Sequence, residues 1–140
     1  MNRMQTLLGR FTMLAVLAWW LPGCGGPARP EVATYLATVT LTTPEQAAED
    51  RQYVLKLFAE QAARHGLVPE NKPPSDALAL YFPASTGLNL SLSAVIMGDQ
   101  SLNLSVIPVN LGRQDKAGCR AVIAAVDKAL QQKFGDRLKK

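Results

Sequence analysis

The fold is decided by residues 89–108, NLSLSAVIMGDQSLNLSVIP, in which apolar residues alternate with serine and asparagine on both sides of Gly98. Such alternation is typical of antiparallel strands that have one buried face and one face open to water. A loop over residues 98–100 places Ile96 opposite Leu102 and keeps every apolar residue on one face, whereas a two-residue turn mixes the faces. The same register pairs Ala94 with Leu104 and Leu92 with Val106. We therefore predict a hairpin.

The polar face of this hairpin is a candidate docking surface. Its small side chains leave the backbone flat and accessible, and apolar residues at its border offer area that a partner can bury. A solvated sheet face explains the same polar residues, so both interpretations stay open. The predicted face consists of Asn89, Ser91, Ser93, Asn103 and Ser105, with Val95, Met97 and Ile107 as its border near the hairpin tip.

A third strand is predicted before the hairpin, at residues 78–82, after a proline-rich connection over residues 68–76. Its expected core-facing residues are Leu78, Leu80 and Phe82. After Val106 the alternation changes parity, and Pro108 stands at that point. A proline in a strand favours a sheet edge or a bulge, and either one resets the alternation.

Two amphipathic helices are predicted around these strands. The first has Thr43 as its N-cap, with proline at the first helical position, and ends at Gly66. The second begins near Asp115 and ends at Gly135. The apolar stripe of the first helix is Ala47, Val54, Leu55, Phe58 and Ala62, widened by Tyr53 and Leu57, and that of the second is Cys119, Val122, Ile123, Val126, Leu130 and Phe134.

The predicted fold class is α+β. Residues 32–41 are rich in valine and threonine, which favours one more strand before the first helix. The order of elements is then β-α-β-β-β-α, and both helices pack most simply on the apolar face of one sheet. We therefore predict a largely antiparallel sheet with two helices on one face and one open face. This single domain spans residues 32–140, enough chain for one core.

The first 23 residues have the three zones of a secretory signal peptide: a basic start, an apolar core and small residues at the end. The apolar core covers residues 11–21, whereas a helix needs roughly 20 residues to cross a bilayer. Leu21-Pro22-Gly23-Cys24 resembles the bacterial lipobox, although Pro22 replaces the usual small or β-branched residue. The resemblance implies cleavage before Cys24 and transfer of a diacylglycerol to its thiol.

The same resemblance implies a location. Lipobox proteins are held by acyl chains such as palmitate and face the periplasm or the cell exterior, and several chains make the attachment effectively permanent. Gly25 stands where an aspartate resembles an inner-membrane retention signal, which favours the periplasmic side of the outer membrane in a Gram-negative host. The expected organisation is a signal peptide over 1–23, a lipidated cysteine and tether over 24–31, and the domain over 32–140.

Residues that could carry chemistry are few, so we expect neither an enzyme nor a metal or cofactor. His65 is the only histidine and has no second ligand or base at a suitable spacing, which favours a capping or solvated role. Glu49 and Asp50 point about 100° apart on a helix, so a solvated face is expected for both. Cys119 is expected to be a buried thiol, with an intermolecular disulfide as the alternative.

The remaining observations indicate a protein that works by binding. The chain carries a net charge of +4, part of which belongs to the predicted signal peptide, and this small balance does not favour nucleic acid. The order of elements is similar to that of the lipopolysaccharide-assembly lipoproteins of the outer-membrane translocon. We expect a lipid-anchored module that binds an envelope protein or serves envelope assembly.

Two other functions stay open at this point. The first is an inhibitor or immunity lipoprotein that blocks a periplasmic hydrolase through a protruding loop, for which residues 83–87 and 98–101 are the candidates. The second is a small hydrolase whose catalytic residues form no recognisable motif. A cluster of polar side chains in a deep pocket is the feature that favours the hydrolase.

Overall fold

One antiparallel sheet organises the residues that the computed structural model describes, which are 32–98, 100–109 and 115–140. All of them belong to one unit, Val32–Lys140. In chain order the elements are β1 (Tyr35–Thr40), α2 (Pro44–His65), β2 (Leu67–Pro69), β3 (Ala77–Pro83), β4 (Leu90–Met97), β5 (Ser101–Pro108), α3 (Lys116–Phe134), η3 (Gly135–Arg137) and β6 (Leu138–Lys139). The predicted signal peptide and tether lie outside the described residues.

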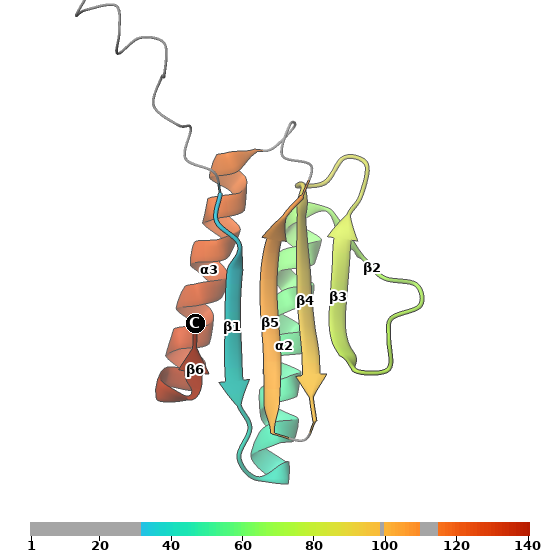
Figure 1. The fold of residues 1–140 in the computed structure, drawn as a ribbon. Helices are drawn as coiled ribbons and strands as arrows, with labels where there is room; N and C mark the ends of the chain where they lie inside the picture. The colour runs from blue at the N-terminus through green and yellow to red at the C-terminus, as the bar shows by residue number, and fades with distance from the viewer. Residues whose placement is uncertain (1–31, 99, 110–114) are drawn as a thin grey trace, which may run out of the picture. The chain divides into compact units, whose positions relative to one another are not determined.

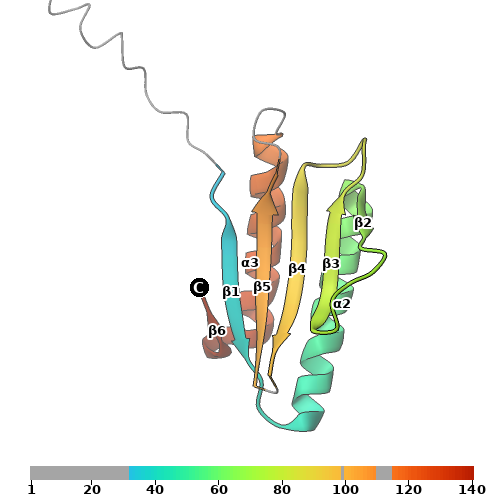
Figure 2. The same cartoon turned by 45° about the vertical axis from the view of Figure 1, so that its right-hand side comes forward.

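The strands lie in the order β2-β3-β4-β5-β1-β6, and every neighbouring pair is antiparallel. Both helices pack on one side of this sheet, and the described residues leave its other side uncovered (Figures 1 and 2). The predicted α+β class, with one covered and one open face, is confirmed.

The β4–β5 hairpin has the predicted register. Ile96 pairs with Leu102, and the next pairs towards the core are Ala94–Leu104 and Leu92–Val106. Gly98 in the turn has a φ of 59°, a region that favours glycine. Leu92 and Val106 are fully buried beneath the helices, as the alternation requires. The hairpin therefore supplies the centre of both faces of the sheet.

The ends of α2 and α3 follow the sequence signals. The Thr43 hydroxyl accepts the backbone N–H of Gln46 at 3.3 Å, and the Asp115 carboxylate accepts that of Gly118 at 2.9 Å. Gly66 ends α2 in the left-handed conformation with a φ of 67°. A side chain on Gly87 collides with the backbone of Gly66, so two glycines allow the loop after β3 to pack on the end of α2.

β3 buries a different face from the predicted one. The register shifts between Ala77 and Ala79, and the pairs beyond the shift are Ala79–Ala94, Leu80–Ser93 and Tyr81–Leu92. Leu78 packs partly against the core, but Leu80 and Phe82 point to the open face. One extra residue in a strand exchanges its two faces, and this strand has apolar residues on both.

Pro108 does not reset the alternation. It pairs with Leu90 and is buried, so it continues the core face of β5 to the last residue of the strand. β5 is an inner strand between β4 and β1, and not an edge. The pairing with β1 ends at Tyr35–Val106, which leaves Pro108 beyond the ladder where its missing N–H is tolerated.

Two short strands were absent from the predicted order. β2 forms at the start of the proline-rich connection and pairs with the end of β3. β6 forms after the 3-10 turn η3 and pairs with β1 through Thr38–Lys139 and Val39–Leu138. Strands of three and two residues are too short to show a hydrophobic period. They add one short strand to each edge of the predicted sheet.

Candidate functional site

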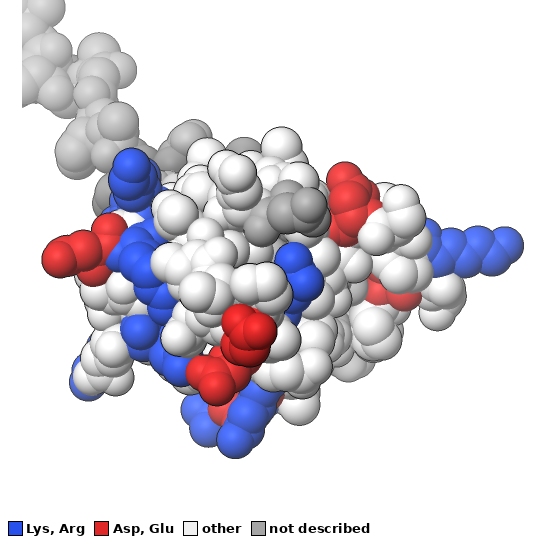
Figure 3. All heavy atoms as spheres, turned by 90° about the horizontal axis from the view of Figure 1, so that it is seen from below, with Lys and Arg blue, Asp and Glu red and all other residues white. Residues whose placement is uncertain are grey.

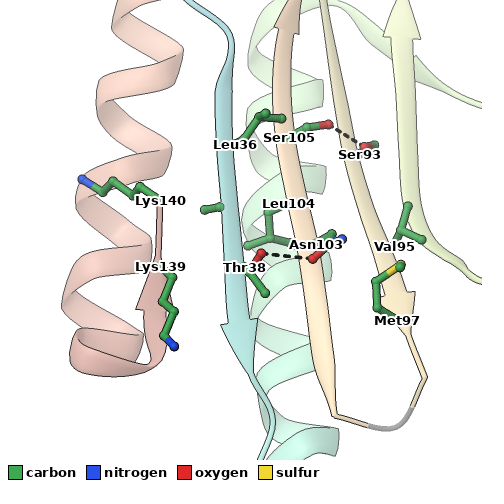
Figure 4. Close-up of a pocket in the computed structure, with 11 residues that line it drawn as sticks. Leu36, Thr38, Ser93, Val95, Met97, Asn103, Leu104, Ser105, Lys139 and Lys140 are labelled. Carbon is green, nitrogen blue, oxygen red and sulfur yellow. Dashed lines mark hydrogen bonds between the residues drawn. The ribbon is translucent and has the colours of Figure 1, made fainter.

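The open face carries a groove of about 460 Å³ over β4, β5 and β1 (Figure 4). We use the term open face for the outward residues of these strands together with those of β2, β3 and β6. The groove is lined by Leu36, Ala37, Thr38, Ser93, Val95, Met97, Asn103, Leu104, Ser105, Lys139 and Lys140. The lining side chains come from β1, β4, β5 and the C-terminal residues of the chain (Figure 4).

Most of the predicted face lines this groove. The residues that do are Ser93, Val95, Met97, Asn103 and Ser105. Ser91 is buried and donates to the backbone oxygen of Ile107 at 3.4 Å, so it adds little accessible surface. Ile107 is exposed but lies at the end of the face away from the hairpin tip, which corrects the predicted border.

Asn89 lies in the bend before β4 and not in the strand. Its backbone oxygen accepts the thiol of Cys119 at 3.7 Å and the backbone N–H of Val109 at 3.1 Å. These bonds join the bend to α3 and to the end of β5. Asn89 does not belong to the set of residues that line the groove.

The polar groups at the centre of the groove bond to one another. The hydroxyl oxygens of Ser93 and Ser105 lie 2.7 Å apart across β4 and β5. The Thr38 hydroxyl donates to the side-chain oxygen of Asn103 at 3.1 Å (Figure 4). Groups that are already hydrogen-bonded lose less on leaving water than unpaired ones. The floor of the groove therefore costs less to desolvate than serine, threonine and asparagine side chains without such bonds.

Large apolar side chains surround this polar centre. The described residues expose five of them: Leu36 (61%), Val68 (47%), Phe82 (39%), Met97 (51%) and Ile107 (38%). The strand registers place all five on the open face, one on each strand from β1 to β5. Single exposed apolar residues are ordinary, but a group gathered on one face marks an interaction site.

Sequence reasoning missed part of this surface. In β1 the outward residues Leu36 and Thr38 alternate with the buried residues Tyr35, Ala37 and Val39. Both sets contain apolar residues, so the alternation does not show which set faces outward. Phe82 was assigned to the core because the bulge in β3 leaves no mark in the sequence. Lys139 reaches the face only because β6 pairs with β1.

Charge on the groove is of one sign, because Lys139 and Lys140 line it and no acidic residue does. The Lys140 ammonium pairs with the Asp127 carboxylate at 2.7 Å, and the Tyr35 hydroxyl donates to the same carboxylate at 3.0 Å. The bond from Lys140 lowers the pKa of Asp127. Burial, together with the bond to Asp127, raises the pKa of Tyr35 well above its usual range.

Asp50 is buried, which corrects the predicted solvated position. It lies on the apolar stripe of α2 between Ala47 and Val54, and its carboxylate accepts the Arg137 guanidinium at 2.6 Å and 3.4 Å. The bond to Asp50 raises the pKa of Arg137. Arg137 also donates to the backbone oxygen of Thr40 at 3.3 Å. These contacts connect η3 to α2 and β1, so the role of Asp50 is structural. The sequence signal for its burial was the helical spacing of residues 47, 50 and 54, which places Asp50 on the apolar stripe.

The other candidate chemical groups have structural positions. Cys119 is fully buried, as predicted, and burial, followed by the charge of Asp115, raises the pKa of its thiol. A raised pKa keeps the thiol protonated and unreactive. The backbone oxygen of His65 accepts the N–H of Leu88 at 2.9 Å. Within the described ranges, no group of histidine, cysteine and carboxylate side chains could hold a metal ion.

The two loops considered for an inhibitor differ in how they are held. The loop over 83–87 is bonded to the end of α2 through the Ala84 N–H and the backbone oxygen of Gly66 at 3.2 Å. Ser85 and Thr86 at its tip are exposed. In the hairpin turn, the backbone oxygen of Gln100 accepts the Leu41 N–H at 2.7 Å. Asp99 lies outside the described residues.

Comparison with known proteins gives no relative: no family model, curated protein or solved structure matches the chain. In the described part of the chain, no helix has the length and apolar character needed to cross a membrane.

Proposed function

We propose that this protein is a lipid-anchored envelope protein that binds a protein partner through its open face. The observation that carries the proposal is the position of the exposed apolar side chains, all of which project from this face among the described residues. The helices bury the opposite face, so the open face is the accessible flat surface of the sheet (Figure 2). A surface of this kind serves binding and requires no catalytic group.

The composition of the face supports a protein partner. Leu36, Met97 and Phe82 supply apolar area, and the bonded hydroxyls between them cost little to desolvate. Protein interfaces combine apolar area with hydrogen-bonding groups. Here the apolar side chains surround a hydrogen-bonded polar centre, and Lys139 stands at the edge. The largest apolar patch of an ordinary monomer is itself about 300–600 Å² and is often functional.

The anchor in this proposal is the thiol of Cys24. The lipobox-like residues 21–24 favour acylation there, and Gly25 favours the periplasmic side of the outer membrane of a Gram-negative host. Residues 25–31, fully extended, span roughly 25 Å, which holds the domain near the headgroups. The partner is then a protein of the same membrane or of the adjacent periplasm.

The anchor is tested by substitution of the attachment residue. In cells fed radiolabelled palmitate, we expect the wild-type chain to incorporate label and Cys24→Ala to incorporate none and to stay uncleaved at this site. Cys119→Ala is the matched control, because it removes the other cysteine and leaves the lipobox intact. Equal label in wild type and Cys24→Ala contradicts the proposed anchor.

The docking surface is tested by placing long charged side chains at its centre. We expect the double variant Ser93→Arg with Ser105→Arg to fold, to be lipidated and to lose the wild-type partners in an in-cell crosslinking and mass-spectrometry comparison. The matched control is Gln52→Arg with Ala59→Arg, which adds the same charge to the exposed side of α2. Unchanged crosslinks in the folded double variant contradict this docking surface.

The loop tip offers a third variant for the same comparison. Ser85→Arg with Thr86→Arg changes two exposed residues of the 83–87 loop and leaves the open face intact. We expect this variant to keep the wild-type crosslinks. Their loss here, with retention in the Ser93 and Ser105 variant, assigns the contact to the loop and favours the inhibitor function.

A further inference from the structure

We propose that the partner on the open face is a second copy of this chain, related by a two-fold axis that runs parallel to the strands between β4 and β5. The inference rests on the proposed function, because it names the occupant of the same docking surface. Symmetric pairs are the commonest assemblies of soluble proteins, and the same patch then serves both copies. The residues on the face decide whether it is complementary to itself.

Such an axis defines which residues face one another. In the order β2-β3-β4-β5-β1-β6, a two-fold axis between β4 and β5 places β4 over β5 and β3 over β1 of the other copy. Rotation about the strand direction keeps each cross-strand row at its own height. Two twisted sheets pack with their strands about 30° apart, so the rows stay aligned best near the axis.

Large residues then face small ones across the axis. Ser91 and Ile107 form one cross-strand pair, and Met97 and Ser101 form another. The rotation therefore lays Ile107 over Ser91 of the second copy, and Met97 over Ser101 of the second copy. Alternation of large and small side chains is what lets two packed layers interdigitate without voids. The hydroxyl pair of Ser93 and Ser105 lies between these contacts and offers no bulk to separate the sheets.

Further from the axis the apolar residues meet one another. Leu80 pairs with Ser93, Ser93 with Ser105, and Ser105 with Leu36, so these four residues form one row across the sheet. The rotation reverses the row and lays Leu36 over Leu80 of the second copy. This contact occurs twice in the pair, once on each side of the axis. Leu36, the most exposed large apolar residue described, is covered by it.

The charges at the two edges of the sheet favour the same axis. Lys139 belongs to the row of Thr38, Asn103, Val95 and Ala77. The reversed row brings Lys139 over the connection before Ala77 in the other copy, which holds two acidic residues, Glu70 and Asp76, and one basic residue, Lys72. Seen from the hairpin end, basic atoms gather mainly on the side of β6 and α3, and acidic atoms lie on that side, near the bottom of the view and on the opposite side, where one extended basic side chain projects (Figure 3).

A two-fold axis across the strands is less compatible with these residues. That rotation places each edge of the sheet over the same edge of the second copy, so Lys139 lies near Lys139 of the second copy. Like charges at an interface oppose association, whereas opposite charges steer it. Both axes place large residues opposite small ones, so the charges at the edges of the sheet are what distinguishes the two axes.

The proposed anchor also favours the strand-parallel axis. The described chain begins at Val32, directly before β1, and residues 25–31 connect it to Cys24. Rotation about the strand direction keeps the beginning of β1 at the same end of both copies, so both proposed tethers start from the same end of the pair. The crossing axis places the beginnings of the two β1 strands at opposite ends of the pair, so both tethers reach one membrane only if one of them runs nearly extended along the sheet.

The size of the face suits a weak or moderate dimer. Five strands at about 4.8 Å spacing and seven residues at about 3.4 Å rise define a face of roughly 20 by 24 Å. A standard interface buries about 800 Å² of accessible surface on each partner. The flat area of this face, about 480 Å², is below that standard size and in the range of weak interfaces. A shared membrane raises the effective concentration of both copies.

The test uses the segment Val32–Lys140, which contains the whole described core. In sedimentation equilibrium at low salt over a range of concentrations, we expect a monomer–dimer equilibrium with no larger species. Ser93→Arg with Ser105→Arg is expected to give monomer at every concentration. A monomeric wild type at the highest concentration overturns the inference.

A charge-exchange series tests the axis itself. Lys139→Glu alone, and Glu70→Lys with Asp76→Lys alone, each place like charges together twice in the pair, so we expect Kd to rise about tenfold at low salt. The three substitutions combined restore opposite charges and are expected to return Kd to near the wild-type value. Lys128→Glu, on the exposed side of α3, is the matched control and should leave Kd unchanged. Additive weakening in the combined variant overturns the strand-parallel axis.

Failure of the inference and failure of the proposed function are distinguishable. A monomeric segment whose full-length form still loses crosslinks in the Ser93 and Ser105 double variant has a docking surface for a different protein. A dimer that this double variant does not disrupt assembles through another surface. In that case the second-copy inference fails, and the crosslinking comparison of the double variant decides the open-face docking proposal separately.

Discussion

The two faces of the β4–β5 hairpin are built from the same twenty residues and meet opposite environments. On the covered face Leu92, Leu104 and Val106 exclude water beneath the helices. On the open face Ser93 and Ser105 bond to each other, and Met97 and Ile107 remain half exposed. The covered face stabilises the fold, whereas the open face can change with little effect on stability. The open face is therefore where the chain is able to carry a function.

The largest contrast is expected between two leucines, one on each face. Leu92→Ala removes a fully buried side chain and is expected to lower the free energy of unfolding by about 3 kcal/mol. Leu36→Ala truncates an exposed side chain and is expected to cost about 0.5 kcal/mol or less in the monomer. Urea unfolding of both variants, monitored by circular dichroism, measures the difference. Equal costs contradict the assignment of the two faces.

The next contrast compares two ion pairs near the C-terminus. Arg137→Ala leaves the buried carboxylate of Asp50 without its cation and is expected to cost about 2–3 kcal/mol. Lys140→Ala breaks the exposed pair with Asp127 and is expected to cost well under about 1 kcal/mol. The control Asp50→Asn combined with Arg137→Ala removes the uncompensated charge and should recover part of the loss. A single Arg137→Ala with native stability contradicts the role of this pair.

Cys119 tests the covered face by chemistry as well as by stability. In the Val32–Lys140 segment it is the only thiol, and it should resist Ellman's reagent until denaturant is added, because a buried thiol reacts only through opening. Cys119→Ala is expected to lower the free energy of unfolding by about 1–2 kcal/mol. Rapid labelling of the native segment is the result that contradicts its burial.

The smallest expected effect is a pH dependence at the edge of the sheet. Because the pKa of Tyr35 is raised in the folded protein, the folded state holds the phenol proton more tightly than the unfolded state. Its contribution to stability is present below the ordinary tyrosine pKa of about 10 and falls as the pH rises beyond it. Tyr35→Phe is expected to flatten this alkaline decline in urea unfolding measured between about pH 9 and pH 11. Identical slopes in both proteins argue against the contribution.

The sequence predicted the elements that are long enough to show a clear hydrophobic period. The eight-residue strands β4 and β5 and the two capped helices have enough apolar positions for their register and ends to be read directly. The bulge at Leu78 reversed β3 because each of its faces offers apolar residues. β2 and β6 escaped prediction because a pair or a triplet of residues contains no period.

The candidate site was predicted to the same extent. Its centre on β4 and β5 follows from alternation alone. Its rim does not, because Leu36 and Lys139 reach the face through pairings of strands that are distant in the chain, and Phe82 reaches it through the bulge in β3. Asp50 was predicted to be solvated because of its charge. Its burial depends on its position on the apolar stripe of α2 and on the cation Arg137, which comes 87 residues later in the chain.

The position of β1 has a consequence for the proposed export of the chain. It is the first strand of the domain, yet both of its neighbours, β5 and β6, come from beyond residue 100. A chain that enters the translocation machinery from its N-terminus cannot complete this sheet until nearly all of its length has been synthesised. Non-local pairing of this kind slows folding and keeps the chain extended for longer. In the export that we propose, the chain passes through a narrow channel unfolded, and this topology delays premature closure of the sheet.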